Sequence, residues 1–306
     1  MVSFRFSGHE TFVCRYAWLP KVIREIATTP TLFNDDDNAM VALGVGKNMV
    51  RAIKFWAESA QVIEQAPKAG YRTSTFGQQL LGHEGHDPFL EDPRTIWLLH
   101  WNIATNPTQP LYFWHQMLNY WHRTDFCESE TVPFFAKNAP AGSPLRSAST
   151  IEQGYRVFVN TYVPTRGRKG QVAEDNLDCP LAELDLVRRM GDRRHLEGTR
   201  EAIYAFNLED KAAVTAELFA YCLDDFWRHS YPDESTLPFR AITVAPGSPG
   251  QIFKLPELAV RRHLDLLKHV TGNSYAFEES ATIQQAVRRK RISSEDLLDA
   301  IYSVQE

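Results

Sequence analysis

The chain has 306 residues, of which 43% are hydrophobic and 23% charged, and its formal net charge is −5. This composition predicts a folded protein with a buried core. Because no run of roughly eighteen apolar residues occurs, it excludes a helix that crosses a membrane. The four cysteines are scattered without a CxxC pair, which argues against a zinc ribbon and a disulfide framework. No export signal is visible at the start of the sequence, so we expect a cytoplasmic protein.

The first part of the chain, residues 1–88, is expected to form a winged helix-turn-helix domain. Three helices are expected: apolar residues recur at helical spacing in the first and third, and the run Asn34–Asp37 offers N-caps for the second. Gly44 stands between the second and the third, where a helix-turn-helix needs a left-handed residue for its sharp turn. After the third helix, residues 61–74 have the pattern of a strand, a turn and a strand, which would be the wing. The three expected helices are Trp18–Ala27, Asn38–Leu43 and Lys47–Ala60.

The third of these helices is expected to carry a cationic face. Three cations recur at i, i+4 and i+7, opposite the apolar stripe, which suits the major groove of DNA and the phosphates beside it. An asparagine at the helix start can bond an adenine edge or a phosphate. A winged helix that contacts protein in place of DNA is the alternative. The candidate DNA-binding residues of this domain are Lys47, Asn48, Arg51, Lys54 and, on the wing, Lys68 and Arg72.

The central region, residues 89–232, is expected to be mostly helical. Asp92 followed by Pro93 predicts a helix start, and the next residues are apolar on nearly all sides, which is typical of a buried helix. We interpret the aromatic residues of the following helix as core, with stacking on an extruded base as the alternative. Residues 124–149 are polar and contain three prolines, so they are expected to be a linker or long loop. The expected helices are 94–104, 111–122, 151–162 and 210–229.

Two charged clusters follow one another in the middle of the chain. The basic one has no apolar periodicity, so we expect an exposed loop that either contacts phosphates or is merely solvated. The acidic one is the best candidate to hold Mg²⁺ or Mn²⁺, which in phosphodiester cleavage activates water and stabilises the leaving oxygen. Alternatively, these carboxylates only cap a helix that starts at Pro180. The basic cluster is Arg166, Arg168 and Lys169, and the acidic cluster is Glu174, Asp175 and Asp178.

The C-terminal part, residues 233–306, repeats the order helix, turn, helix and hairpin, so a second winged-helix-like module is expected there. Its main helix is expected from Leu255 to Thr271, and its two strands over residues 275–277 and 282–287. The basic run Arg288–Arg291 is either a solvated segment or a grip for DNA or a partner. The whole chain is therefore predicted to be mainly α, of the α+β class.

Short motifs extend along nearly the whole chain; they are Phe6–Phe12, Leu43–Val50, Asp87–Pro93, Glu174–Pro180 and Gly247–Gly250. In this order they resemble the SspB-type family, a bacterial family catalogued as a domain of unknown function and linked to DNA phosphorothioation and phage defence. The resemblance implies DNA nicking within a single-strand DNA phosphorothioate modification system. It also implies three partners: a cysteine desulfurase, an ATPase and a PAPS-reductase-like ATP pyrophosphatase.

The resemblance assigns no catalytic residues. It does draw attention to His9 and Glu10 in the first motif, which either join an active site or buttress the first helix. Three hypotheses follow. In the first, the protein is a metal-dependent nickase: the winged helix holds duplex DNA, and the acidic cluster, with His9 or Glu10, binds the ion. In the second it is a non-enzymatic DNA-binding adaptor, which the lack of a recognised nuclease motif favours. In the third it is a transcriptional regulator.

Overall fold

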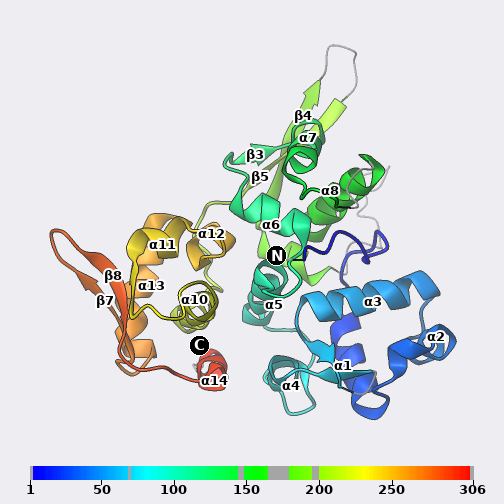
Figure 1. Ribbon diagram of the computed structural model, residues 1–306, viewed down its shortest axis with the longest axis horizontal. Coiled ribbons are helices and arrows are strands. Elements are labelled where there is room, and N and C mark those ends of the chain that lie inside the picture. Colours follow the sequence, from blue (N-terminus) through cyan, green and yellow to red (C-terminus); the bar gives the residue numbers. More distant parts are fainter. Residues whose placement is uncertain (1–2, 68–69, 144–147, 165–178, 195–199, 304–306) are drawn as a thin grey trace. The chain divides into compact units, whose positions relative to one another are not determined.

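The computed structural model describes residues 3–67, 70–143, 148–164, 179–194 and 200–303. The chain forms two compact units: residues 1–117 with 121–207, and residues 118–120 with 208–306 (Figure 1). Both units combine helices with small antiparallel sheets. The domain boundaries expected at 88/89 and 232/233 stay predictions. Within the described ranges, no helix is long and apolar enough to cross a bilayer.

The N-terminal elements agree with the helices expected from the sequence, each within two residues of its expected bounds. Asp35 caps α2, because its carboxylate accepts hydrogen bonds from the backbone N–H groups of Asp37 at 3.0 Å and Asn38 at 3.3 Å. Gly44 ends α2 with φ 63° and ψ 36°, the left-handed conformation expected there. The elements are α1 (Trp18–Thr28), η1 (Leu32–Asn34), α2 (Asp36–Leu43), α3 (Lys47–Ser59), β1 (Ile63–Gln65), β2 (Tyr71–Thr73) and α4 (Thr75–Leu81).

The core of the first unit is aromatic. α5 (Pro93–Thr105) is capped by Asp92 and buried on nearly all sides, as the sequence predicts. From α6 (Tyr112–Asn119), the Trp114 indole donates a 2.8 Å hydrogen bond to the hydroxyl of Tyr162, which ends α8 (Ala148–Tyr162). Trp114 is only 1% exposed. Trp114 and Trp121 are therefore core, as interpreted from the sequence, whereas Tyr120 is 40% exposed.

The loop expected over residues 124–149 is wrong for most of its length. The segment instead forms β3 (Asp125–Phe126) and α7 (Glu128–Asn138), and it contains a proline, Pro133, inside the helix. The buried side chains of Thr131 and Phe135 give α7 an apolar contact face, and this tertiary burial outweighs the backbone hydrogen bond that the proline removes.

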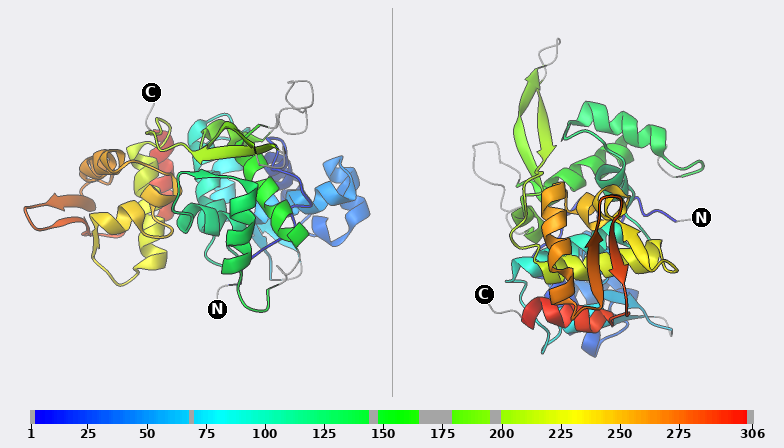
Figure 2. Two further views of the ribbon diagram at one scale, coloured as in Figure 1. Left: turned by 90° about the horizontal axis from the view of Figure 1, so that it is seen from above. Right: turned by 90° about the vertical axis from the view of Figure 1, so that its left-hand side faces the viewer.

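A second correction concerns the stretch after η2 (Pro180–Leu184), where no sheet was expected. β4 (Val187–Arg194) and β5 (Arg200–Phe206) pair antiparallel, in the strand order β3-β5-β4. β3 pairs only with Ala205 and Tyr204, so the remainder of the hairpin is two-stranded. This β4–β5 ribbon projects from the rest of the first unit (Figures 1 and 2). Its charged residues hide the period-2 pattern because little of the ribbon is buried.

The second unit packs helices around a three-stranded sheet with the order β6-β8-β7. The predicted main helix and both strands are present. The helix expected from residue 210 begins later, because Thr215 is its N-cap and accepts a hydrogen bond from the Leu218 N–H at 3.3 Å. The elements are α10 (Ala216–Ser230), β6 (Thr236–Pro238), α11 (Phe239–Val244), α12 (Pro249–Ile252), α13 (Glu257–Val270), β7 (Tyr275–Glu279), β8 (Gln284–Arg288) and α14 (Ser294–Ser303).

Candidate functional site

The exposed face of α3 presents two cations that share one carboxylate. The Lys47 ammonium lies 2.9 Å from Asp36 Oδ2, and Arg51 Nη2 lies 3.9 Å from the same oxygen. The Lys47 side chain is 54% exposed and that of Arg51 50%, and Asn48 is also exposed. The hydrogen bond from Lys47 holds the pKa of Asp36 below its usual value. Asp36 therefore keeps both cations together on the solvent side of the helix.

Lys54 behaves differently from the other two cations. Its ammonium lies 4.8 Å from the centre of the Tyr71 ring and 5.9 Å from that of Phe33, so it stacks on the strand β2 and on η1. On the same strand, Arg72 pairs with Glu64 of β1 at 2.6 Å. Lys68, the other cation expected on the wing, lies outside the described residues. The structure thus places Lys47, Asn48 and Arg51 on one exposed face and Lys54 at its edge.

His9 and Glu10 lie in a turn that supports α3. His9 is 6% exposed, and its ring meets the Phe55 ring edge-on at a centroid distance of 5.5 Å. Its Nδ1 accepts a hydrogen bond from the Thr11 N–H at 3.1 Å. Burial, with the nearby Arg5, lowers the pKa of His9 to about 4. Glu10 has a positive φ of 48° and is partly exposed. These contacts buttress α3, whereas the sequence suggested a buttress for the first helix, and a catalytic role for either residue stays a prediction.

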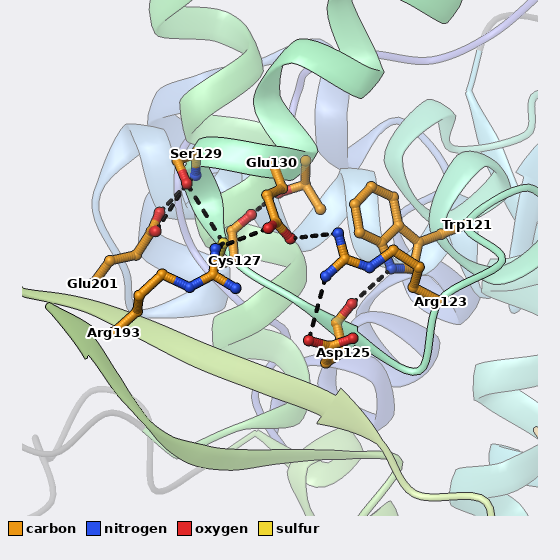
Figure 3. Close-up of polar contacts among 9 residues, drawn as sticks. Trp121, Arg123, Asp125, Cys127, Ser129, Glu130, Arg193 and Glu201 are labelled. Atoms are coloured by element: carbon orange, nitrogen blue, oxygen red, sulfur yellow. Dashed lines mark hydrogen bonds and ion pairs between the residues drawn. The ribbon is translucent and has the colours of Figure 1, made fainter. Parts of the chain in front are cut away.

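Carboxylates tie the β4–β5 ribbon to the first turn of α7 (Figure 3). From β5, the Glu201 carboxylate accepts hydrogen bonds from the Ser129 N–H at 2.6 Å and the Ser129 hydroxyl at 2.8 Å. From β4, Arg193 donates to Glu130 at 2.8 Å, and Arg123 contacts the other oxygen of Glu130 at 2.9 Å. Arg193 holds the pKa of Glu130 below its usual value. The attachment is therefore ionic and partly exposed to solvent.

Beside this attachment, two adjoining cavities of about 570 and 840 Å³ form one cleft between α8 and β5, which we call the α8 cleft. Asn160 and Tyr204 line both cavities. Tyr155 lines the first; it is 4% exposed, and its hydroxyl has no hydrogen-bond partner among the described residues. Phe126 stacks on the Tyr204 ring at an interplanar angle of 29° and a centroid distance of 5.8 Å. The size suits a small organic ligand or a nucleotide.

The charges of the cleft are mostly paired. Arg156 lies 3.2 Å from Glu128 and 3.8 Å from Glu152. In the second cavity, Arg188 pairs with Asp185. Arg200, which lines the first cavity, has no ion pair with any other residue that the structure describes. The only cationic group that the described part of the first cavity leaves available for a ligand is therefore that of Arg200.

Both predicted charged clusters lie outside the described residues: Arg166, Arg168 and Lys169, and Glu174, Asp175 and Asp178. The described residues on either side of them do meet at the α8 cleft. Pro164 and Ala182 both line its second cavity. The Cys179 thiol donates a 3.3 Å hydrogen bond to the Thr161 carbonyl, so the two flanks lie side by side. No group of three metal-ligating side chains occurs among the described residues.

Comparisons with protein families and solved structures show which known proteins the chain is similar to. The family model described as a protein of unknown function, DUF4007, matches residues 6–302. The chain belongs to the DUF4007 family. Crystal structures of SspB, one of them with bound magnesium ion, have the same fold as this DUF4007 chain. Each has a TM-score of 0.83 and 23% identity, and the match covers 99% of this chain and 88% of SspB. A search of curated proteins finds no match. The resemblance predicted from the motifs is thereby confirmed.

Sequence reasoning on this DUF4007 protein missed the ribbon and the α8 cleft. The available signal was a hairpin pattern: the run Val187–Met190 and the run Ala202–Phe206 flank a polar segment that contains Gly198. Tyr155 gave no signal of its own, because a tyrosine on an apolar helix face most often belongs to the core.

Proposed function

We propose that this DUF4007 protein binds duplex DNA through α3 and nicks one strand by metal-dependent hydrolysis. It would do so as a component of a single-strand DNA phosphorothioate modification system, with a cysteine desulfurase, an ATPase and a PAPS-reductase-like enzyme as partners. The observation that carries the proposal is the exposed face of α3, where Lys47, Asn48 and Arg51 stand together. Cations on an exposed helix of this kind suit the phosphates that flank the major groove.

The surroundings of α3 support this interpretation. We interpret α1 to α3 with the β1–β2 hairpin as a winged helix-turn-helix in which α3 is the recognition helix. Gly44 provides the left-handed turn before α3, and the hairpin follows α3 directly, which is the order that such domains use. By the same reasoning we interpret α13 and the β7–β8 hairpin as a second module of this type.

The proposed hydrolysis rests on the acidic cluster Glu174, Asp175 and Asp178. Two observations support it. The described flanks of that cluster line the α8 cleft, and an SspB crystal structure contains magnesium ion. A divalent ion held by these carboxylates would activate a water molecule for attack on phosphorus.

Binding is tested with a labelled duplex over a range of salt concentrations. Removing one phosphate-binding cation lowers the slope of log affinity against log salt by about 0.9, so the double variant Lys47→Ala/Arg51→Ala should reduce the slope by about 1.8. Lys54→Ala should have a smaller effect, because its ammonium already stacks on Tyr71. The matched control is Lys137→Ala/Arg240→Ala, which removes two exposed cations elsewhere. An unchanged affinity and slope in the α3 variant would exclude α3 from the DNA interface.

Nicking is tested on supercoiled plasmid with Mg²⁺ and, separately, Mn²⁺. Asp175→Ala and Asp178→Ala should each slow nicking by at least about a hundredfold, since even the outer partners of a metal site cost ten- to a hundredfold. Asp233→Ala, which removes an exposed carboxylate of the second unit, is the control. If the wild type binds duplex but yields no open circles with either metal, the protein is a non-enzymatic adaptor. Folded aspartate variants that nick at the wild-type rate would exclude the acidic cluster.

A further inference from the structure

The distal end of the β4–β5 ribbon carries two arginines directly opposite each other. Arg194 of β4 pairs in register with Arg200 of β5, and both side chains are exposed. Like charges at opposite positions destabilise a strand pair. Neither arginine has an ion pair with another described residue, whereas Arg193, the neighbour of Arg194, is bound by Glu130. Among the described residues nothing offsets the repulsion within this pair, and a bound anion would relieve it.

The same face of the ribbon leads into the α8 cleft. Side chains alternate between the two faces of a strand, so Arg200, Ala202 and Tyr204 share one face of β5, and all three line the first cavity. Glu201, which alternates with them along the strand, also lines this cavity and is bound to Ser129 (Figure 3). Cations at the distal end and an aromatic ring further along the strand are therefore arranged in line.

Inside the cleft, Tyr155 provides an independent sign of a ligand. Tyr155 lines the first cavity, its side chain is more than nine-tenths buried, and its buried hydroxyl has no hydrogen-bond partner among the described residues. An unsatisfied buried hydroxyl is costly, and an acceptor on a bound molecule would remove that cost. Asn160 adds an amide, which can donate and accept, on the same cavity wall.

Three acidic side chains among the described residues line the first cavity, and each has a neighbour that binds it. Glu128 and Glu152 flank Arg156, and Glu201 accepts two hydrogen bonds from Ser129. These contacts hold the carboxylates on α7 and α8, away from the distal end of the ribbon. The unpaired positive charge lies at the ribbon and the aromatic and amide groups lie inside the cleft.

We infer that the α8 cleft binds a nucleotide of a single-stranded nucleic-acid segment, with a phosphate on Arg194 and Arg200, the base against Tyr204, and an acceptor atom on the Tyr155 hydroxyl. Stacking on an aromatic ring combined with a cationic track is how proteins hold single strands without reading sequence. The inference rests on the proposed function, because a strand that is opened for nicking supplies such a segment.

The test measures binding of a fluorescein-labelled oligothymidylate and of a blunt duplex to the full chain. Arg194→Gln/Arg200→Gln should reduce the salt slope for the single strand by about 0.7, because the two arginines share one phosphate. Arg194→Lys/Arg200→Lys should restore the slope, because it restores the charge. Lys137→Gln/Arg240→Gln is the matched control. If the glutamine pair keeps the wild-type slope, or if the lysine pair fails to restore it, the ribbon does not bind phosphate.

Tyr155→Phe separates binding from folding. Deleting the unpartnered hydroxyl should leave the melting temperature unchanged or raise it, yet weaken oligothymidylate binding about threefold to tenfold, as one neutral hydrogen bond implies. Tyr204→Leu should weaken it about tenfold, because leucine cannot stack on a base. If both variants are folded and bind the oligonucleotide like the wild type, the inference is overturned.

The two proposals fail in distinguishable ways. Lys47→Ala/Arg51→Ala should weaken duplex binding and leave oligonucleotide binding unchanged. Arg194→Gln/Arg200→Gln should weaken oligonucleotide binding and leave duplex binding unchanged. A wild type that binds the oligonucleotide but no duplex would contradict the proposed function alone. A ribbon variant that no longer binds duplex but still binds the oligonucleotide would overturn the cleft inference alone.

Discussion

The helix α3 and the β4–β5 ribbon both present cations to solvent, but different forces attach them to the first unit. α3 buries one face in an aromatic core, where Phe55 is 2% exposed and lies against His9 and under Arg5. The ribbon buries little, and Glu130 and Glu201 hold it to α7. Apolar burial is insensitive to salt, whereas partly exposed ion pairs are screened by it. The position of α3 should therefore be fixed under conditions in which the ribbon loosens.

The largest effect on the free energy of unfolding is expected where α3 packs into the core. Phe55→Ala should lower the free energy of unfolding by about 3–5 kcal/mol, the usual cost of emptying a buried phenylalanine site. Urea denaturation at low and at high salt measures it, and the decrease should be the same in both. A decrease that shrinks strongly in high salt would mean that ionic contacts, not burial, hold α3.

The next effect is a pH dependence from His9. Its folded pKa of about 4 lies below the ordinary value of 6.5, so its contribution to stability is complete above pH 6.5 and is lost as pH falls toward 4. The slope should be about 1.4 kcal/mol per pH unit in that window. His9→Asn keeps an acceptor for the Thr11 N–H and should remove this part of the slope. Comparing the two proteins cancels His115 and His263, whose pKa values are also lowered. Parallel stability curves would contradict the prediction.

A smaller effect on the free energy of unfolding, which depends on salt, is expected where the ribbon attaches to α7. Glu130→Gln removes the carboxylate that holds Arg193 and Arg123. We expect the free energy of unfolding to fall by about 1 kcal/mol or less, because partly exposed ion pairs contribute little. Faster hydrogen exchange of the β4 amides at low salt, with no difference from wild type at high salt, is the expected signature. Glu91→Gln, an exposed site without a described ion pair, is the control. Equal exchange at low salt in both variants would show that Glu130 does not anchor the ribbon.

The smallest effect concerns the carboxylate on the cationic face of α3. Asp36→Asn frees Lys47 and Arg51 from a competing anion, so duplex affinity should rise about twofold to fivefold, the range of an exposed ion pair. Asp37→Asn makes the same charge change in the same helix turn without an ion pair to α3. Equal affinity changes in the two variants would mean that only net charge matters.

The difference between the buried helix α3 and the exposed β4–β5 ribbon also explains what could be predicted from the sequence. The apolar period of α3 and the turn at Gly44 are local signals, so helices and cationic face were both predictable. The helix α7 was not, because Pro133 and the polar residues at both ends of the segment are typical of a loop, and the burial of Phe135 decides otherwise. The ribbon was missed because its exposed strands lack a buried face.

The α8 cleft could not be predicted for a different reason. Tyr155 on α8 and Tyr204 on β5 are 49 positions apart in the sequence, and no local pattern links them. Both rings contact Phe126 of β3, which pairs in register with Tyr204. The position of Arg194 directly opposite Arg200 is likewise a property of strand register and not of composition.

Residues 118–120 lie with the second unit, although the residues on both sides of them belong to the first. The Leu118 carbonyl accepts hydrogen bonds from the Lys254 ammonium at 2.6 Å and from the Gln251 amide at 2.7 Å. The Asn119 side chain accepts one from the Gly247 N–H at 2.7 Å. A gene fragment that starts at codon 208 would encode a polypeptide without these acceptors. Truncation for separate expression is thus expected to yield an unstable product, and a fusion tag or split site should avoid this tripeptide.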